Sequence, residues 1–207
     1  MDEAYWSAVR TLRLGIADPL DTLEPAEWDA PSLCRGWRVR DVAGHLSLVP
    51  TITTWELMSG APRAGFNPNR INTLLAIRYG SRPGDEIVSR IRDHAGARRT
   101  AKILDTRDFL FDIVVHSQDI AVPLGRDFPV PVEFTRQGLQ RVWSMGWPFR
   151  ARRAFAGLTL SATDTNWTVG SGPEVAGSAL SLLLLLTGRT STVLDVLHGP
   201  GVKALSY

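Results

Sequence analysis

The chain has 207 residues, of which 44% are hydrophobic and 21% are charged, a composition typical of a globular protein with one sizeable core. Its 23 Lys and Arg residues nearly balance its 21 Asp and Glu residues, so the formal net charge is only +2. Because the sequence also lacks a long basic run, this charge pattern argues against a nucleic-acid-binding or membrane-binding surface.

Two long amphipathic helices are predicted at the start of the chain. Apolar residues recur every three or four positions over residues 2–23 and again over residues 37–58. Pro19 lies inside the first pattern and should kink that helix or restart it. Pro50 lies inside the second pattern and should bend that helix or break one of its hydrogen bonds.

In the middle of the chain, the sequence pattern predicts a long connection followed by three further helices. The connection covers residues 59–82 and has room for a short helix; such length inside a compact domain is often functional. A helix over residues 83–100 follows, with acidic residues at its start and arginines at its end, as the helix dipole favours. Two more helices are expected over residues 106–121 and 131–147.

The pattern changes after the fifth helix. Alternating apolar residues on either side of a polar turn predict a β-hairpin over residues 156–172. A buried helix over residues 174–187 and a short helix over residues 191–198 follow. We therefore expect a mainly α protein, with a helical bundle over residues 1–150 and a small α+β region over residues 151–207 packed on it.

A line of polar residues runs along the predicted helix of residues 106–121. At about 100° per residue, Asp112, His116 and Asp119 fall within an arc of roughly 60°, and apolar residues flank this arc on both sides. The line should therefore face the interior or a cleft, where ionisable groups are costly unless they are paired or bind a metal. An acid and a histidine four residues apart have the right pitch to bind one divalent ion.

A further ligand must come from another element. His45 is the natural candidate, because it lies beside the apolar stripe of the helix predicted over residues 37–58. Two histidines and one carboxylate would leave one coordination position open, which is typical of a catalytic zinc site. Zn²⁺ is favoured, with Fe²⁺, Ni²⁺ and Mn²⁺ as alternatives. Asp119 would orient a histidine or a substrate group. The same spacing also suits an inward polar cluster without metal, or a surface-exposed group of residues, so these interpretations stay open at this point.

Two stretches of the sequence resemble a known family. Residues 28–49, WDAPSLCRGWRVRDVAGHLSLV, resemble the N-terminal signature of the mycothiol-dependent maleylpyruvate isomerase family, within the DinB-like metal-binding four-helix-bundle superfamily. Residues 112–126 are similar to the second signature, in which an acid is followed by His four residues later and Asp three residues after that. With a similar C-terminal hairpin and helix, the resemblance covers about residues 1–190.

The resemblance implies a DinB-like four-helix bundle over residues 1–150 and a divalent metal held by His45, Asp112 and His116. The family often has Glu where this chain has Asp112, whose side chain is one methylene shorter; this difference can change metal preference. The resemblance also implies mycothiol, a low-molecular-weight thiol, as the cosubstrate.

The expected function is therefore a metal-dependent transferase or isomerase in which the thiol attacks a small electrophilic substrate. A metal cation favours thiolate over thiol, and Asp119 is the candidate catalytic residue. Two alternatives remain: a metallohydrolase, in which the ion activates water, and a metal-binding stress protein that catalyses no reaction.

The remaining features concern location and partners. Cys34 is the only cysteine, which excludes an intrachain disulfide and suits a reducing cytoplasm; a structural role is expected for it. The acidic N-terminus does not resemble a signal peptide. The most apolar stretch, residues 179–188, is shorter than the roughly 20 residues that span a membrane. We expect a cytoplasmic monomer or homodimer that binds a thiol and an electrophile, but neither nucleic acid nor membrane.

Overall fold

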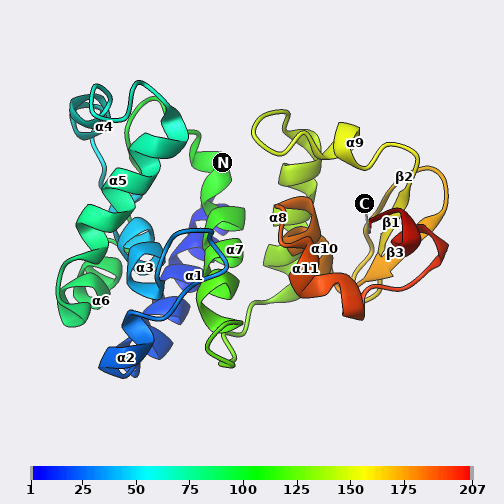
Figure 1. The fold of residues 1–207 in the computed structure, drawn as a ribbon, viewed down its shortest axis with the longest axis horizontal. Helices are drawn as coiled ribbons and strands as arrows, with labels where there is room; N and C mark the ends of the chain where they lie inside the picture. Colours follow the sequence, from blue (N-terminus) through cyan, green and yellow to red (C-terminus); the bar gives the residue numbers. More distant parts are fainter. Residues whose placement is uncertain (1, 206–207) are drawn as a thin grey trace. The chain divides into compact units, whose positions relative to one another are not determined.

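The computed structural model describes residues 2–205 of the chain. Contacts divide it into two compact units, Met1–Pro129 and Val130–Tyr207. Helices make up the N-terminal unit, whereas the C-terminal unit combines helices with a small three-stranded sheet (Figure 1). The mainly α fold expected from the sequence is confirmed. Among the described residues, no helix is both long and apolar enough to span a membrane.

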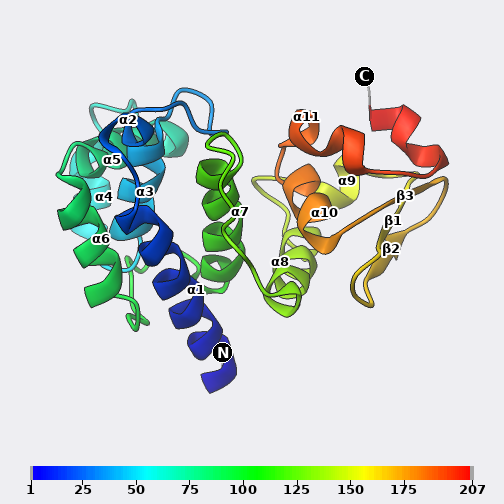
Figure 2. The ribbon, with the colours of Figure 1, turned by 90° about the horizontal axis from the view of Figure 1, so that it is seen from below.

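The N-terminal unit is a bundle centred on two helices, α1 and α3. Its helices are α1 (Glu3–Asp21), α2 (Pro25–Trp28), α3 (Val39–Leu48), α4 (Thr54–Gly60), α5 (Pro68–Gly80), α6 (Gly84–Asp93), the 3-10 turn η1 (Thr106–Asp108) and α7 (Phe109–Ala121). Helix α1 packs against α6 and α7, and α3 packs against α5, α6 and α7 (Figures 1 and 2). The apolar stripes of these helices face each other, which places α3 beside α7.

The helix predicted over residues 37–58 is two helices in the structure. Helix α3 ends at Leu48, just before Pro50, which has no N–H to continue a helical ladder. Helix α4 then begins after Thr53, whose hydroxyl accepts a hydrogen bond from the Glu56 backbone N–H at 3.1 Å. Helix α5 fills much of the predicted connection, because Asn67 caps its first turn.

A pair of glycines allows α3 and α5 to lie unusually close. A Cβ atom added at Gly44 would lie 2.3 Å from the backbone nitrogen of Gly80, and one added at Gly80 would lie 2.6 Å from the carbonyl oxygen of Arg40. Any other residue would therefore force the two backbones apart. Since His45 follows Gly44 directly, this contact also helps to fix the position of a candidate site residue.

The C-terminal unit combines a leucine-rich helix with the sheet. Its elements are α8 (Val132–Ser144), α9 (Ala151–Ala154), β1 (Thr159–Ala162), β2 (Thr168–Gly170), β3 (Glu174–Gly177), α10 (Ala179–Leu186), α11 (Thr190–Val193), η2 (Leu194–Val196) and η3 (Pro200–Leu205). The strand order is β2-β1-β3, with β1 antiparallel to β2 and parallel to β3. Leu160 in the central strand is opposite Val169 on one side and Val175 on the other.

The predicted hairpin corresponds to β1 and β2, but the helix predicted over residues 174–187 is wrong in its first turn. Glu174–Gly177 forms β3, because its backbone pairs with β1. Helix α10 begins only after Ser178, whose side chain accepts a hydrogen bond from the Ser181 N–H at 3.1 Å. Five consecutive buried leucines, Leu182–Leu186, then form the core of this unit.

The two compact units divide after Pro129, whereas the sequence places the boundary near residue 150. The difference concerns α8, which the sequence groups with the N-terminal bundle. In the structure α8 packs against the leucine-rich α10, so its apolar face belongs to the core of the C-terminal unit.

Candidate metal centre

Three metal-ligating side chains predicted from the sequence lie together in the N-terminal unit. His45 comes from the last turn of α3, and Asp112 and His116 come from consecutive turns of α7. One potential ligand atom from each residue lies within 4.8 Å of the other two. The convergence follows from the packing of α3 on α7, together with the four-residue spacing that places Asp112 and His116 on one face.

The carboxylate of Asp112 lies between the two imidazoles. Its Oδ2 is 3.4 Å from Nε2 of His45, and its Oδ1 is 3.5 Å from Nε2 of His116. Donor atoms on one tetrahedral Zn²⁺, each about 2.0–2.1 Å from the ion, lie roughly 3.3 Å apart. Despite its shorter side chain, Asp112 therefore reaches both histidines at distances that suit a shared divalent ion.

The Nε2 atom of His45 provides an independent test of this fit. The residue is only 7% exposed, and its buried Nε2 makes no hydrogen bond among the described residues. A buried polar atom without such a partner is costly, and native structures rarely leave one unexplained. A cation between His45, Asp112 and His116 would satisfy this nitrogen, so the donor set fits a metal.

The other nitrogen of the His116 ring faces a second group of side chains. Nδ1 of His116 lies 2.8 Å from Oδ2 of Asp119, a carboxylate with no exposed surface. The Cys34 thiol donates to the same oxygen at 3.0 Å, and its Sγ lies 3.6 Å from Nδ1 of His116. The structure thus places both Asp119 and Cys34 beside the Nδ1 atom of His116. Sequence reasoning did not connect Cys34 to the site.

The charges around His116 determine its protonation in the metal-free protein. Burial lowers the pKa of His116, but the Asp112 carboxylate and the hydrogen bond to Asp119 raise it by more. The net result is a pKa well above the usual value of 6.5. A metal ion and a proton therefore compete for this imidazole.

Aromatic and cationic side chains surround the cluster. The Trp37 ring stacks near the His116 ring, with centroids 6.2 Å apart and planes 17° apart, and its indole N–H donates to Thr73 Oγ1 at 3.3 Å. The Arg13 guanidinium is buried and donates to the carbonyl oxygens of Ala95 and Ala97 at 3.1 and 2.8 Å. The helical periodicity of the sequence did not indicate that Trp37 or Arg13 would lie near the cluster.

Burial also affects Arg13 itself. It lowers the pKa of Arg13 to about 10, and the nearby Asp112 carboxylate offsets part of this effect. The positive charge of Arg13 is therefore held close to the cluster without being one of its possible ligands.

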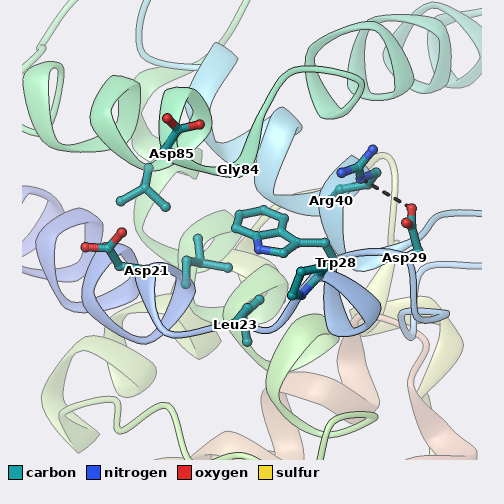
Figure 3. Close-up of a pocket in the computed structure, with 10 residues that line it drawn as sticks. Asp21, Leu23, Trp28, Asp29, Arg40, Gly84 and Asp85 are labelled. Atoms are coloured by element: carbon teal, nitrogen blue, oxygen red, sulfur yellow. Dashed lines mark ion pairs between the residues drawn. The ribbon is translucent and has the colours of Figure 1, made fainter.

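A cavity of about 370 Å³ lies elsewhere in the N-terminal unit and shares no lining residue with the cluster. Side chains from α1, α2, α3 and α6 line it, with Trp28 as one wall and the Arg40–Asp29 ion pair beside it (Figure 3). A Cβ atom at Gly84 would lie 2.8 Å from the Trp28 ring, so glycine is needed for this wall.

Comparisons with known proteins agree with the fold. Residues 9–108 match a family model described as the mycothiol maleylpyruvate isomerase N-terminal domain. This range includes His45 but ends before Asp112 and His116.

Two solved structures have a similar fold, each with a TM-score of 0.63 over 96% of this chain and 92% of the other. One is a mycothiol-dependent maleylpyruvate isomerase, 16% identical, and the other is a histidine-to-alanine mutant of the mycothiol-dependent maleylpyruvate isomerase, 14% identical. No curated protein gives a significant sequence match.

Proposed function

Because residues 9–108 match the model of the mycothiol maleylpyruvate isomerase N-terminal domain, we propose that the chain belongs to this family and is a divalent-metal-dependent enzyme. Its cosubstrate is a low-molecular-weight thiol, mycothiol by family, and its substrate is a small electrophile. The reaction is either transfer of the thiol to this electrophile or isomerisation through reversible addition of the thiol.

The metal ligands are His45, Asp112 and His116, and Zn²⁺ is the ion that such a donor set favours. Three protein ligands leave room for an exogenous thiol. When bound, the ion supplies positive charge that favours thiolate over thiol at neutral pH. The observation that carries the proposal is the buried Nε2 of His45, which has no hydrogen-bond partner within residues 2–205 but lies 3.4 Å from the Asp112 carboxylate.

The other residues of the site orient the ligands and limit access of water. Asp119 accepts the Nδ1 hydrogen of His116, so Nε2 of that ring is the nitrogen that would bind the ion together with His45 and Asp112. The Trp37 ring covers one side of both imidazoles, with its centroid 5.7 Å from that of His45, and reduces solvent access there.

We assign Asp119 a positioning role. From the sequence it is the candidate catalytic residue, but its carboxylate has no exposed surface and is engaged by both Cys34 and His116. It therefore acts on the reaction through the orientation of His116 and does not touch the substrate.

The first experiment measures bound metal. The purified full-length protein is loaded with Zn²⁺ and dialysed, and its metal content is determined for wild type, H45A and H116A. Both variants should lose most of the bound zinc, while H198A, a control at an exposed histidine in the C-terminal unit, should retain it. Undiminished metal in H116A would refute the proposed site.

The second experiment measures reaction with electrophiles in the presence and absence of added thiol. If the electrophile reacts only when both metal and thiol are present, the proposal is supported. Turnover that needs metal but no thiol would instead favour the metallohydrolase. Metal binding without consumption of any electrophile would favour a stress protein that only binds metal.

A further inference from the structure

Two groups of potential metal ligands in the described part of the chain share one imidazole. The first group is the proposed site, His45, Asp112 and His116, and the second is Cys34, His116 and Asp119. The first faces Nε2 of His116, and the second faces Nδ1 of the same ring. The roles of the two groups can be distinguished by their internal contacts.

The second group is already satisfied by hydrogen bonds. Asp119 Oδ2 lies 2.8 Å from Nδ1 of His116 and 3.0 Å from Sγ of Cys34, and both distances are those of hydrogen bonds. The first group is different, because its two nitrogen–oxygen distances are 3.4 and 3.5 Å and Nε2 of His45 makes no hydrogen bond to any residue that the structure describes. A cation in the first group would satisfy this nitrogen, whereas the contacts of the second group leave no such atom to satisfy.

We propose that Cys34 is a positioning residue whose thiol donates to the Asp119 carboxylate and orients it, so that Asp119 in turn holds the Nδ1 hydrogen of His116. The Nε2 lone pair of His116 is then directed to the metal. This inference rests on the proposed function, because it assigns the metal to the His45 side of the ring. It also excludes Cys34 as a metal ligand.

The loop around Cys34 supports this role, because it is fixed to the same part of α7. The Leu33 backbone N–H donates to the Asp119 carbonyl oxygen at 3.0 Å. The Cys34 N–H donates to Ser32 Oγ at 3.1 Å, and that hydroxyl donates to the Trp37 carbonyl oxygen at 2.9 Å. The backbone on both sides of the thiol is therefore held in place, and Sγ is presented to Asp119 with little freedom.

Substitutions at Cys34 separate hydrogen bonding from packing. C34A removes the donor, whereas C34S retains a hydroxyl donor on a similar side chain. Loss of a group that orients a ligand typically weakens metal binding by about 10-fold to 100-fold. We expect C34A to bind Co²⁺ about 10-fold to 100-fold more weakly than wild type in competition with a chelator, and C34S to recover most of this loss.

The same samples provide two readouts that together distinguish the positioning role from a purely structural one. Urea unfolding of each metal-free variant reports packing, and the absorption spectrum of the Co²⁺ form reports the ligands. The proposal is overturned if C34A binds Co²⁺ as tightly as wild type, or if C34S binds as weakly as C34A. It is also overturned if the wild-type spectrum contains a sulfur-to-cobalt charge-transfer band that is absent in C34S.

Two measurements keep the test decisive. If C34A does not fold, the wild-type Co²⁺ spectrum and the Co²⁺ affinity of D119N still test the proposal. D119N should bind Co²⁺ about 10-fold to 100-fold more weakly than wild type. A wild-type affinity in D119N would refute the proposal. H116A distinguishes this inference from the proposed function. Metal retained in H116A defeats the function itself, whereas metal lost in H116A but unaffected in C34A and D119N defeats only the role of Cys34.

Discussion

Replacing Gly44 with alanine should separate α3 from α5 and disturb the metal site at once. The added Cβ would lie 2.3 Å from the backbone nitrogen of Gly80, where ordinary contacts begin at 3.4 Å, so the helices must move apart by about 1 Å. The atoms it meets belong to the backbone of α5, which cannot rotate away as a side chain could. Since His45 is the next residue, it moves with the backbone.

The size of the effect follows from two opposing contributions. Overpacking of a dense interior costs typically 1–3 kcal/mol, and we take about 3 kcal/mol because backbone atoms are involved. Alanine gains about 1 kcal/mol over glycine within a helix. The free energy of unfolding should therefore fall by about 2 kcal/mol. A displacement of His45 by about 1 Å should also weaken Zn²⁺ binding by roughly 10-fold or more.

The assay is urea unfolding of the metal-free protein, followed by chelator competition for Zn²⁺ with the folded variant. Gly15 offers a matched control, because it lies within α1, is exposed, and an added Cβ would meet no atom within 4 Å. G15A should be neutral or stabilise the protein by up to about 1 kcal/mol, with unchanged metal affinity. If G44A unfolds at the same urea concentration as G15A, the close approach of α3 and α5 is not as described.

Three further predictions concern charge and metal. Burial raises the pKa of Glu56, but hydrogen bonds from Thr53 and Tyr79 outweigh it, so the net pKa is lowered. The contribution of Glu56 to stability is therefore present above the ordinary pKa of 4.5 and is lost as pH falls through the lower folded value. E56Q should accordingly lose less urea stability than wild type between about pH 5 and pH 3. R13M leaves buried carbonyl oxygens without their donor and should lower the free energy of unfolding by about 2–3 kcal/mol in the same assay, and a smaller loss would mean that water replaces the guanidinium. Zn²⁺ at 100 times its dissociation constant should stabilise wild type by about 2.7 kcal/mol in thermal unfolding but leave H45A unchanged, and equal stabilisation of both would place the ion elsewhere.

Local spacing was sufficient to predict the part of the site that lies on one helix. Asp112, His116 and Asp119 share a face because helical geometry requires it, and the flanking apolar residues indicate that this face is turned inward. The position of His45 could be proposed from its apolar stripe and from the family signature.

Long-range contacts account for what the sequence did not predict. Cys34 lies in a loop without periodicity, and only the docking of Leu33 on the backbone of Asp119 brings its thiol to the site. Strand β3 exists because a non-local partner, β1, pairs with a segment that could equally begin a helix. Likewise, the effect of Pro50 depends on whether Thr53 can start a new helix, which residue type alone does not decide.

The shared ring of His116 has a consequence for how substitutions combine. The His116 ring contacts Cys34 and Asp119 through Nδ1 and faces Asp112 and His45 through Nε2, so its orientation depends on both groups. Substitutions in the two groups should therefore not have independent effects on the free energy of metal binding. A double-mutant cycle across the ring should show non-additive free energies. In an evolving lineage, a substitution tolerated at one nitrogen would thus alter which residues are acceptable at the other.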